Sequence, residues 1–272
     1  MYSQSSLENL LNKCDLDLEE LKNPVFCYVP KEGLEDDIFL NRKIVPKHCK
    51  VMDREVIYFG YGKSNYKPIE HQVDNREVYA PITLIFDGET INLDNITDIY
   101  VYDTGALNHP DSPLKTTLEG IYTRLTKNKF YKWNIKKENL SKAVKLLFDS
   151  YYNYIYDIPN PIIESKEFPH FNSYLSQLMN YHKEKKGDVQ LSNFEIIVDK
   201  EVPFQPIAII YPDVTETSAH SKVKLDIPSN CIPIPYNILD NGAEFEGITL
   251  NELYNPMRKK AKTTVIKLNE TK

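Results

Sequence analysis

DVQLSNFEIIVDKEVPFQPIAIIYP, residues 188–212, is the most informative stretch of this 272-residue chain. It contains two short apolar runs, Phe194–Val198 and Ile207–Tyr211, joined by a polar connection that includes proline. Both runs are rich in Ile and Val and end at turn residues, a pattern typical of buried strands. The stretch therefore predicts two short buried strands joined by a polar connection.

One acidic residue, Glu195, stands inside the first of these strands. A carboxylate costs free energy to bury unless another group pairs with it, so Glu195 is the leading candidate for a catalytic residue. The alternative interpretation is a strand with one face in water, on which Glu195 is an ordinary solvated side chain. The spacing alone favours this alternative.

Composition indicates a globular protein of one large or two small domains, with 41% hydrophobic and 26% charged residues. The formal net charge of −6 argues against a general nucleic-acid binder, although it leaves room for a local basic patch.

The cysteines and the N-terminal sequence point to the cytoplasm. Four cysteines (Cys14, Cys27, Cys49 and Cys231) form no CxxC pair, which predicts free thiols in a reducing compartment. His48 lies beside Cys49, but no second His or Cys cluster stands at metal-ligand spacing, so no zinc site is expected. The chain shows no signal sequence and no apolar run of membrane-spanning length, so we expect a cytoplasmic protein with no membrane contact.

The first half of the chain predicts mainly strands. A helix with a leucine face begins at Ser6, and a strand at 25–29 precedes a helix at 31–43. Further strands are expected at 56–66, 79–86, 90–93 and 99–102, with Asp87-Gly88 as a hairpin turn between the second and third.

Two glycines interrupt the strand at 56–66. Gly60 and Gly62 flank Tyr61 and precede Lys63 and Asn65, which would let the backbone pass close to a ligand. The spacing matches neither a P-loop nor a dinucleotide fingerprint, so a tight turn at a strand end is the alternative.

The strand at 99–102 runs into Asp103-Thr104-Gly105, a triplet also found in aspartic proteases. Those enzymes need two such carboxylates, and this chain has one copy. We therefore expect Asp103 to order the loop that follows.

The second half begins with helical periodicity. Apolar residues at spacings of three and four predict a helix of about five turns from Asn139 to Tyr154 and a second helix at 171–185. IPIPY at 232–236 predicts an extended path within a loop-rich region. The basic tail, 257–272, reads as partly strand-like and solvated, with RNA or a partner protein as a possible contact.

Three blocks of this sequence, together with one shorter segment, resemble ADP-ribosyltransferases of the His-Tyr-Glu kind. The blocks are PVFCYVPKEGLEDDIFLNRKIVP (24–46), VIYFGYGKSNYK (56–67) and LSNFEIIVDKEVPFQPIAIIYP (191–212). VYDTGAL (101–107) and YFGYGK also resemble segments of bacterial phage-defence toxins of this type. The resemblance covers roughly residues 23–212 and implies an α+β fold, an ADP-ribosyltransferase-like split β-sandwich with peripheral helices.

The resemblance implies an enzyme that uses NAD as a substrate and transfers ADP-ribose to a nucleic acid or a protein. Glu195 takes the place of the catalytic glutamate. Cys27 and Tyr28 fall in the first block, Tyr58 or Tyr61 is the aromatic residue that stacks on nicotinamide, and Lys63 and Asn65 face the remainder of NAD. A toxin or antiviral-defence effector of this kind implies a restraining partner such as an antitoxin.

The sequence departs from the family pattern in the first block, where Cys27 stands in place of His and Val29 in place of Thr or Ser. Cys is a poor hydrogen-bonding substitute for His. Two alternatives therefore remain: a non-catalytic binding module of the same fold, and an NAD glycohydrolase that uses water as the acceptor.

The predicted elements and the extent of the resemblance divide the chain into three parts. An N-terminal helix occupies residues 1–22, and the catalytic domain spans 23–212 with a helical segment at 139–186. A C-terminal extension, 213–272, either packs on this domain or trails from it.

Overall fold

The fold is described from a computed structural model of the whole chain. The structure describes residues 11–12, 25–30, 35–49, 52–64, 81–101, 135–160, 193–213, 227–237 and 250–270. These residues divide into two compact units, each described by itself below. The first unit draws on residues 1–22, 66–68 and 98–196, and the second on residues 23–65, 69–97 and 197–272.

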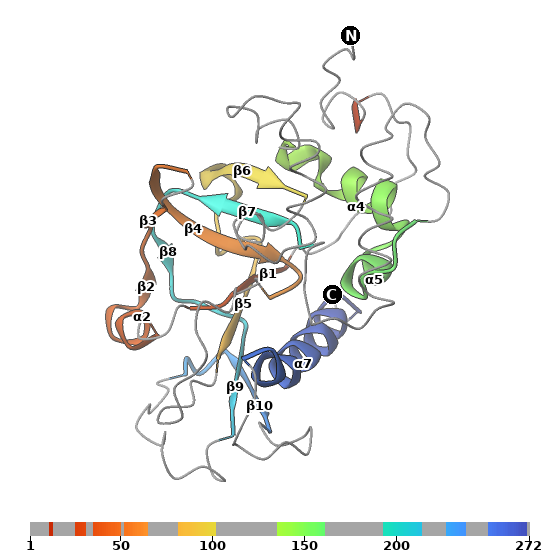
Figure 1. The fold of residues 1–272 in the computed structure, drawn as a ribbon. Helices are drawn as coiled ribbons and strands as arrows, with labels where there is room; N and C mark the ends of the chain where they lie inside the picture. The colour runs from red at the N-terminus through yellow and green to blue at the C-terminus, as the bar shows by residue number, and fades with distance from the viewer. Residues whose placement is uncertain are drawn as a thin grey trace. The chain divides into compact units, whose positions relative to one another are not determined.

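The described elements follow one another in a mixed α and β order (Figure 1). They are β1 (Val25–Tyr28), α2 (Glu35–Asn41), β2 (Lys43–Ile44), β3 (Lys47–Cys49), β4 (Arg54–Tyr61), β5 (Thr83–Asp87), η1 (Leu93–Asn95), β6 (Ile96–Tyr100), η4 (Lys137–Asn139), α4 (Leu140–Phe148), α5 (Tyr151–Ile155), β7 (Glu195–Val198), β8 (Val202–Pro203), β9 (Ala208–Pro212), β10 (Ile232–Tyr236) and α7 (Leu250–Glu270).

The main sheet has eight strands in the order β10-β9-β5-β1-β4-β7-β6, with β3 also paired to β4. Strand β1 pairs antiparallel with β4 and β5, as do β5 with β9 and β3 with β4, whereas β9 and β10 are parallel. Strands β2 and β8 form a separate antiparallel pair. The predicted α+β class is confirmed at this level.

Aromatic side chains pack one face of the sheet in the second unit. Phe26 lies opposite Tyr61 on β4 and opposite Phe86 on β5, so these three side chains point to the same face. Phe26 and Tyr61 meet edge to face with ring centroids 5.9 Å apart, and Phe59 meets Phe86 at the same centroid distance. Such contacts bury large apolar area and hold β1, β4 and β5 together.

Strand β10 lies at one end of the sheet. Two residues on its outer side have no N–H group to donate. Ile232 donates its N–H to Ile207 O (3.0 Å), so the N–H groups of alternate residues point toward β9. Pro233 and Pro235 occupy the positions whose N–H groups would point outward. Proline at an edge blocks the pairing of a further strand, which protects this edge from association.

Helix α7 packs against β9 and β10 (Figure 1). Its buried residues Met257, Ala261 and Val265 recur every four positions, which gives the helix an apolar stripe toward the sheet. Thr83 Oγ1 contacts Met257 Sδ at 3.1 Å and ties the helix to β5. The prediction of a partly strand-like, solvated tail is wrong, because this stripe outweighs the β-prone Thr-Thr-Val-Ile run.

In the first unit, α4 and α5 replace the single five-turn helix predicted from Asn139 to Tyr154. Asp149 takes a left-handed backbone conformation (φ 66°) and ends α4, while Ser150 accepts a hydrogen bond from the Asn153 N–H (3.1 Å) and begins α5. Asp tolerates the left-handed region and Ser is a favoured N-terminal cap, so local hydrogen bonding overrides the apolar periodicity.

The predicted hairpin after β5 is also wrong. Asp87 Oδ1 accepts hydrogen bonds from the N–H and the hydroxyl of Thr90 (both 2.8 Å), and Asn92 has a positive φ of 45°. The chain continues into η1 and then β6, which begins three residues before the predicted strand at 99–102. Short polar side chains here bind the local backbone and compete with strand pairing.

Strands β1, β7 and β9 agree closely with their predicted positions. Strand β5 begins at Thr83 rather than at residue 79, and β4 ends at Tyr61 rather than at residue 66. The short strands β2, β3 and β8 were not predicted. Three of the predicted free cysteines, Cys27, Cys49 and Cys231, are free thiols. Cys14, Asn65, Asp103, the helix at 171–185 and most of the N-terminal helix lie outside the described residues.

Candidate functional site

Glu195 begins strand β7 in the first unit, and its side chain is buried with 4% of its surface exposed. All four residues of β7 are buried, so both faces of the strand are covered. The interpretation of Glu195 as a solvated surface residue is therefore wrong. A carboxylate at this depth costs free energy to desolvate that a surface acid does not, so Glu195 is either a functional group or a structurally paired one.

Tyr154 on α5 fixes the chain immediately before Glu195. Its hydroxyl accepts a hydrogen bond from the Phe194 N–H (2.9 Å), and its ring packs against the Phe194 ring with centroids 4.8 Å apart. Phe148 packs against Tyr154 at 5.2 Å from the other side of the helix break. This aromatic cluster holds the entry to β7 and so sets the position of the carboxylate.

The residues predicted to bind NAD lie in the second unit. Cys27 and Tyr28 are adjacent on β1, so their side chains point to opposite faces of the sheet. Cys27 is fully buried, and burial raises the pKa of its thiol far above its ordinary value. A thiol in that state stays protonated at neutral pH and is no nucleophile.

Tyr58 and Tyr61, the two candidates for stacking on nicotinamide, also lie on opposite faces of β4. Tyr61 shares the aromatic face with Phe26 and is fully buried. Tyr58 is half-buried, and its hydroxyl donates a hydrogen bond to Cys49 Sγ on β3 (2.8 Å). Of the two rings, Tyr58 alone retains exposed surface.

Strand β4 ends at Gly62, one of the two glycines singled out in the sequence. Gly62 has a φ of 64°, a conformation that favours glycine, and its N–H donates to Val25 O (2.8 Å). Lys63 and Ser64 follow with side chains that are 1% exposed. The glycine thus turns the chain into the protein interior, in agreement with the interpretation as a tight turn at a strand end.

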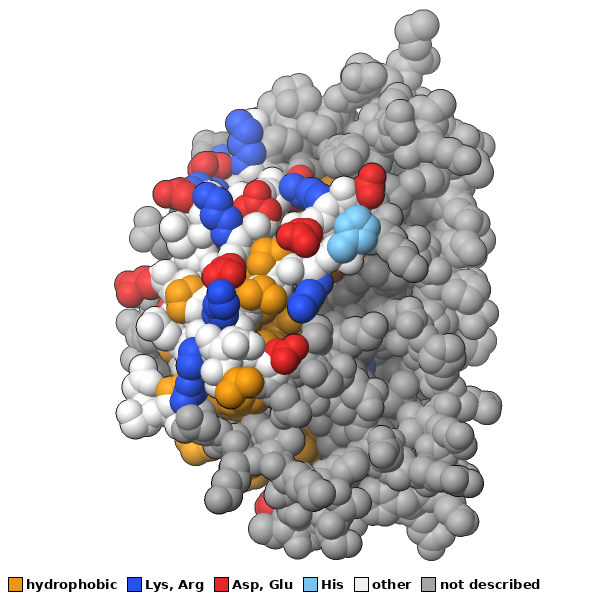
Figure 2. All heavy atoms as spheres, turned by 90° about the vertical axis from the view of Figure 1, so that its left-hand side faces the viewer, with side chains coloured by type: hydrophobic (Ala, Val, Ile, Leu, Met, Phe, Trp, Pro, Cys, Tyr) orange, Lys and Arg blue, Asp and Glu red, His pale blue; other side chains and the backbone are white. Residues whose placement is uncertain are grey.

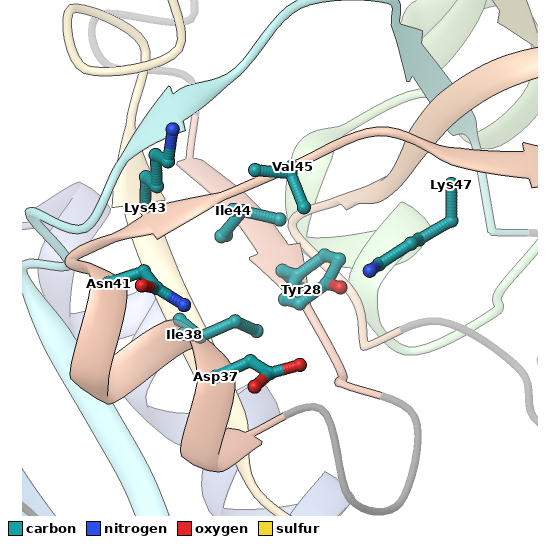
Figure 3. A pocket seen from close by; sticks show the side chains of 8 residues that line it. All are labelled: Tyr28, Asp37, Ile38, Asn41, Lys43, Ile44, Val45 and Lys47. Carbon is teal, nitrogen blue, oxygen red and sulfur yellow. The ribbon is translucent and has the colours of Figure 1, made fainter.

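Tyr28 lines a pocket of about 160 Å³ beside α2 and β2 in the second unit (Figure 3). The apolar lining comes from its own ring and from Ile38, Ile44 and Val45. Ligand pockets for drug-sized molecules typically measure 300 Å³ or more, so this pocket is too small for a whole dinucleotide. Sequence reasoning singled out Tyr28 but missed the pocket, because its remaining residues form no motif.

The surface around α2, β2 and β3 carries apolar side chains among charges of both signs (Figure 2). Among the described residues, no three His, Cys, Asp or Glu side chains converge as a metal ion requires. No helix in the described part of the chain combines the length and apolar character needed to cross a membrane.

Glu195 and the described NAD-site candidates thus fall in different compact units. Comparison with protein-family models, with curated proteins and with solved structures finds no match to this chain.

Proposed function

We propose that this chain is an NAD-dependent ADP-ribosyltransferase, a toxin or antiviral-defence effector that modifies a nucleic acid or a protein. The observation that carries the proposal is the burial of Glu195 at the start of β7, where the resemblance to this family puts the catalytic glutamate. The α+β fold with its mostly antiparallel sheet is compatible with the finer class, a split β-sandwich with peripheral helices.

In this proposal the bond between nicotinamide and the ribose C1 atom breaks, and its electron pair leaves with nicotinamide. The ribose then carries positive charge, which the Glu195 carboxylate stabilises near the 2′-hydroxyl. A nucleophilic oxygen or nitrogen of the acceptor bonds to C1 and loses a proton. The products are the ADP-ribosylated acceptor, nicotinamide and H⁺.

Tyr58 is the better of the two stacking candidates, because its ring keeps exposed surface on the sheet face opposite Tyr61. Contacts from Tyr61, Cys27 and Lys63 to NAD require exposure that these buried side chains lack here. If the Lys63 side chain became exposed, its ammonium would meet the pyrophosphate as a point charge.

A non-catalytic binding module of the same fold is the second candidate. The observation that favours it is Cys27, which replaces the histidine of the family and is fully buried. An NAD glycohydrolase shares the proposed steps and differs only in using water as the acceptor.

Expression in a bacterial host tests the proposal. We expect the wild-type chain to arrest growth and Glu195→Gln to relieve the arrest, with both proteins accumulating to equal levels as judged by immunoblot. Labelled NAD added to host extract should then mark a species sensitive to nuclease or to protease, which identifies the acceptor. Equal growth of the two strains, without label transfer, would favour the binding module; a restraining antitoxin should suppress the arrest.

A further inference from the structure

The Tyr28 pocket brings together polar groups that have no polar partner in the part of the chain that the structure describes. Asp37 and Asn41 project from α2, and Lys47 projects from the start of β3 (Figure 3). Among the described residues, the side chains of Tyr28, Asp37, Asn41 and Lys47 form no hydrogen bond or ion pair. An apolar floor with a few converging polar groups is the usual form of a small-molecule site.

A second lysine at the pocket, Lys43, is already engaged. Its ammonium lies 2.8 and 2.9 Å from the two carboxylate oxygens of Glu201, so its charge is compensated within the protein. Among the described residues, one carboxylate, Asp37, and one ammonium, Lys47, are thus left to recognise a ligand. This balance favours a ligand that carries one charge of each sign.

The two charges are accompanied by neutral hydrogen-bonding groups. The Tyr28 hydroxyl and the Lys47 ammonium point toward each other in the pocket (Figure 3). Burial raises the pKa of Tyr28 to about 12, so its hydroxyl stays protonated and can donate to an anion. Asn41 adds a neutral amide group from the helix that also carries Asp37 (Figure 3).

The volume limits the apolar part of the ligand. A cavity of roughly 150 Å³ lined by aliphatic and aromatic side chains holds one benzene ring. The present pocket, of about 160 Å³, thus suits a single branched or cyclic apolar group between Ile38, Ile44, Val45 and the Tyr28 ring.

We propose that this pocket binds a free apolar α-amino acid. Its carboxylate meets Lys47 and the Tyr28 hydroxyl, its ammonium meets Asp37, and its side chain covers Ile44 and Val45. The inference does not depend on the proposed chemistry of Glu195, which takes no part in it, although Tyr28 is shared with the predicted NAD site.

Calorimetric titration of the full chain with L-leucine tests the inference. Two analogues complete the set: 4-methylpentanoate lacks the ammonium and 3-methylbutylamine lacks the carboxylate. We expect L-leucine to bind and each analogue to bind at least about tenfold more weakly, since each analogue lacks one of the two charged groups that the pocket pairs. Asp37→Asn and Lys47→Met should each weaken L-leucine binding by a similar factor.

Asp199→Asn and Lys200→Met are matched controls, because both residues are exposed and lie outside the pocket lining. They should leave the affinity unchanged. No heat with L-leucine at about 20 mM, or an affinity for 4-methylpentanoate equal to that for L-leucine, would overturn the inference; so would equal losses in the control variants. Circular dichroism of each variant separates a lost contact from a lost fold.

Discussion

Glu195→Gln is expected to lower the rate of nicotinamide release from NAD by about 100- to 1000-fold, the loss typical of removing one preorganised group at a developing charge. Glutamine has nearly the volume of glutamate and retains one oxygen, so the packing of β7 should survive. What the substitution removes is the negative charge that balances the ribose in the transition state. The measurement is the initial rate of nicotinamide formation with purified proteins at saturating NAD.

Glu138→Gln is the matched control, since Glu138 lies on η4 in the same unit and its side chain is exposed. It should release nicotinamide at the wild-type rate. Thermal unfolding of both variants checks that the fold is retained. If Glu195→Gln and wild type release nicotinamide equally fast, Glu195 is a structural carboxylate and the proposed chemistry is wrong.

Phe59→Ala is expected to reduce the free energy of unfolding by about 3–5 kcal/mol, the usual cost of truncating a buried phenylalanine. Phe59 is fully buried on β4, and its ring meets those of Tyr28 (5.5 Å between centroids) and Phe86 (5.9 Å). Removing it leaves a cavity at the centre of the aromatic face that joins β1, β4 and β5. Urea titration followed by tyrosine fluorescence or circular dichroism measures the change.

Leu40→Ala provides the comparison, because Leu40 is 81% exposed on α2 and its loss should change stability by no more than about 0.5 kcal/mol. A cost below about 1 kcal/mol for Phe59→Ala would show that this aromatic face does not form the core of the second unit.

The two strands predicted from residues 194–198 and 207–211 could be found in the sequence because Ile and Val gather there between turn residues. From the sequence alone, a buried Glu195 was one of two interpretations, the other being a solvated surface side chain. Whether an acid inside a strand faces water depends on what covers each face, and that depends on residues far away in the sequence. Here Phe148 and Tyr154, some forty residues earlier, pack beside the start of β7.

Local hydrogen bonds account for the two elements that apolar pattern mispredicted. The Asp87 carboxylate accepts a hydrogen bond from the Thr90 N–H where a hairpin strand was predicted. Asp149 ends α4 and Ser150 begins α5, so the predicted single helix is two helices. These side chains are short and polar, and their preference for binding nearby backbone is individually weak. Helix α7 shows the opposite case, in which an apolar repeat of four positions prevails over β-prone residues.

Tyr58 and Tyr61 lie on opposite faces of β4 because side chains alternate between the two faces of a strand. This follows only once β4 is known to run through Gly60 without a break. The sequence left this point open because glycine can also interrupt a strand. The pocket at Tyr28 could not be foreseen at all, since Asp37 and Lys47 come together through the turn that joins α2 to β2.

Isothermal titration calorimetry of the purified wild-type chain with NAD tests the central claim most directly. If the chain uses NAD as a substrate, NAD should bind saturably. The Glu195→Ala variant should retain this binding, because the carboxylate acts mainly on the transition state rather than on bound NAD. Binding should be weakened by Tyr58→Ala, which removes the stacking ring. No binding at millimolar NAD, with or without added host extract, would contradict the proposed use of NAD and would favour binding of a protein partner.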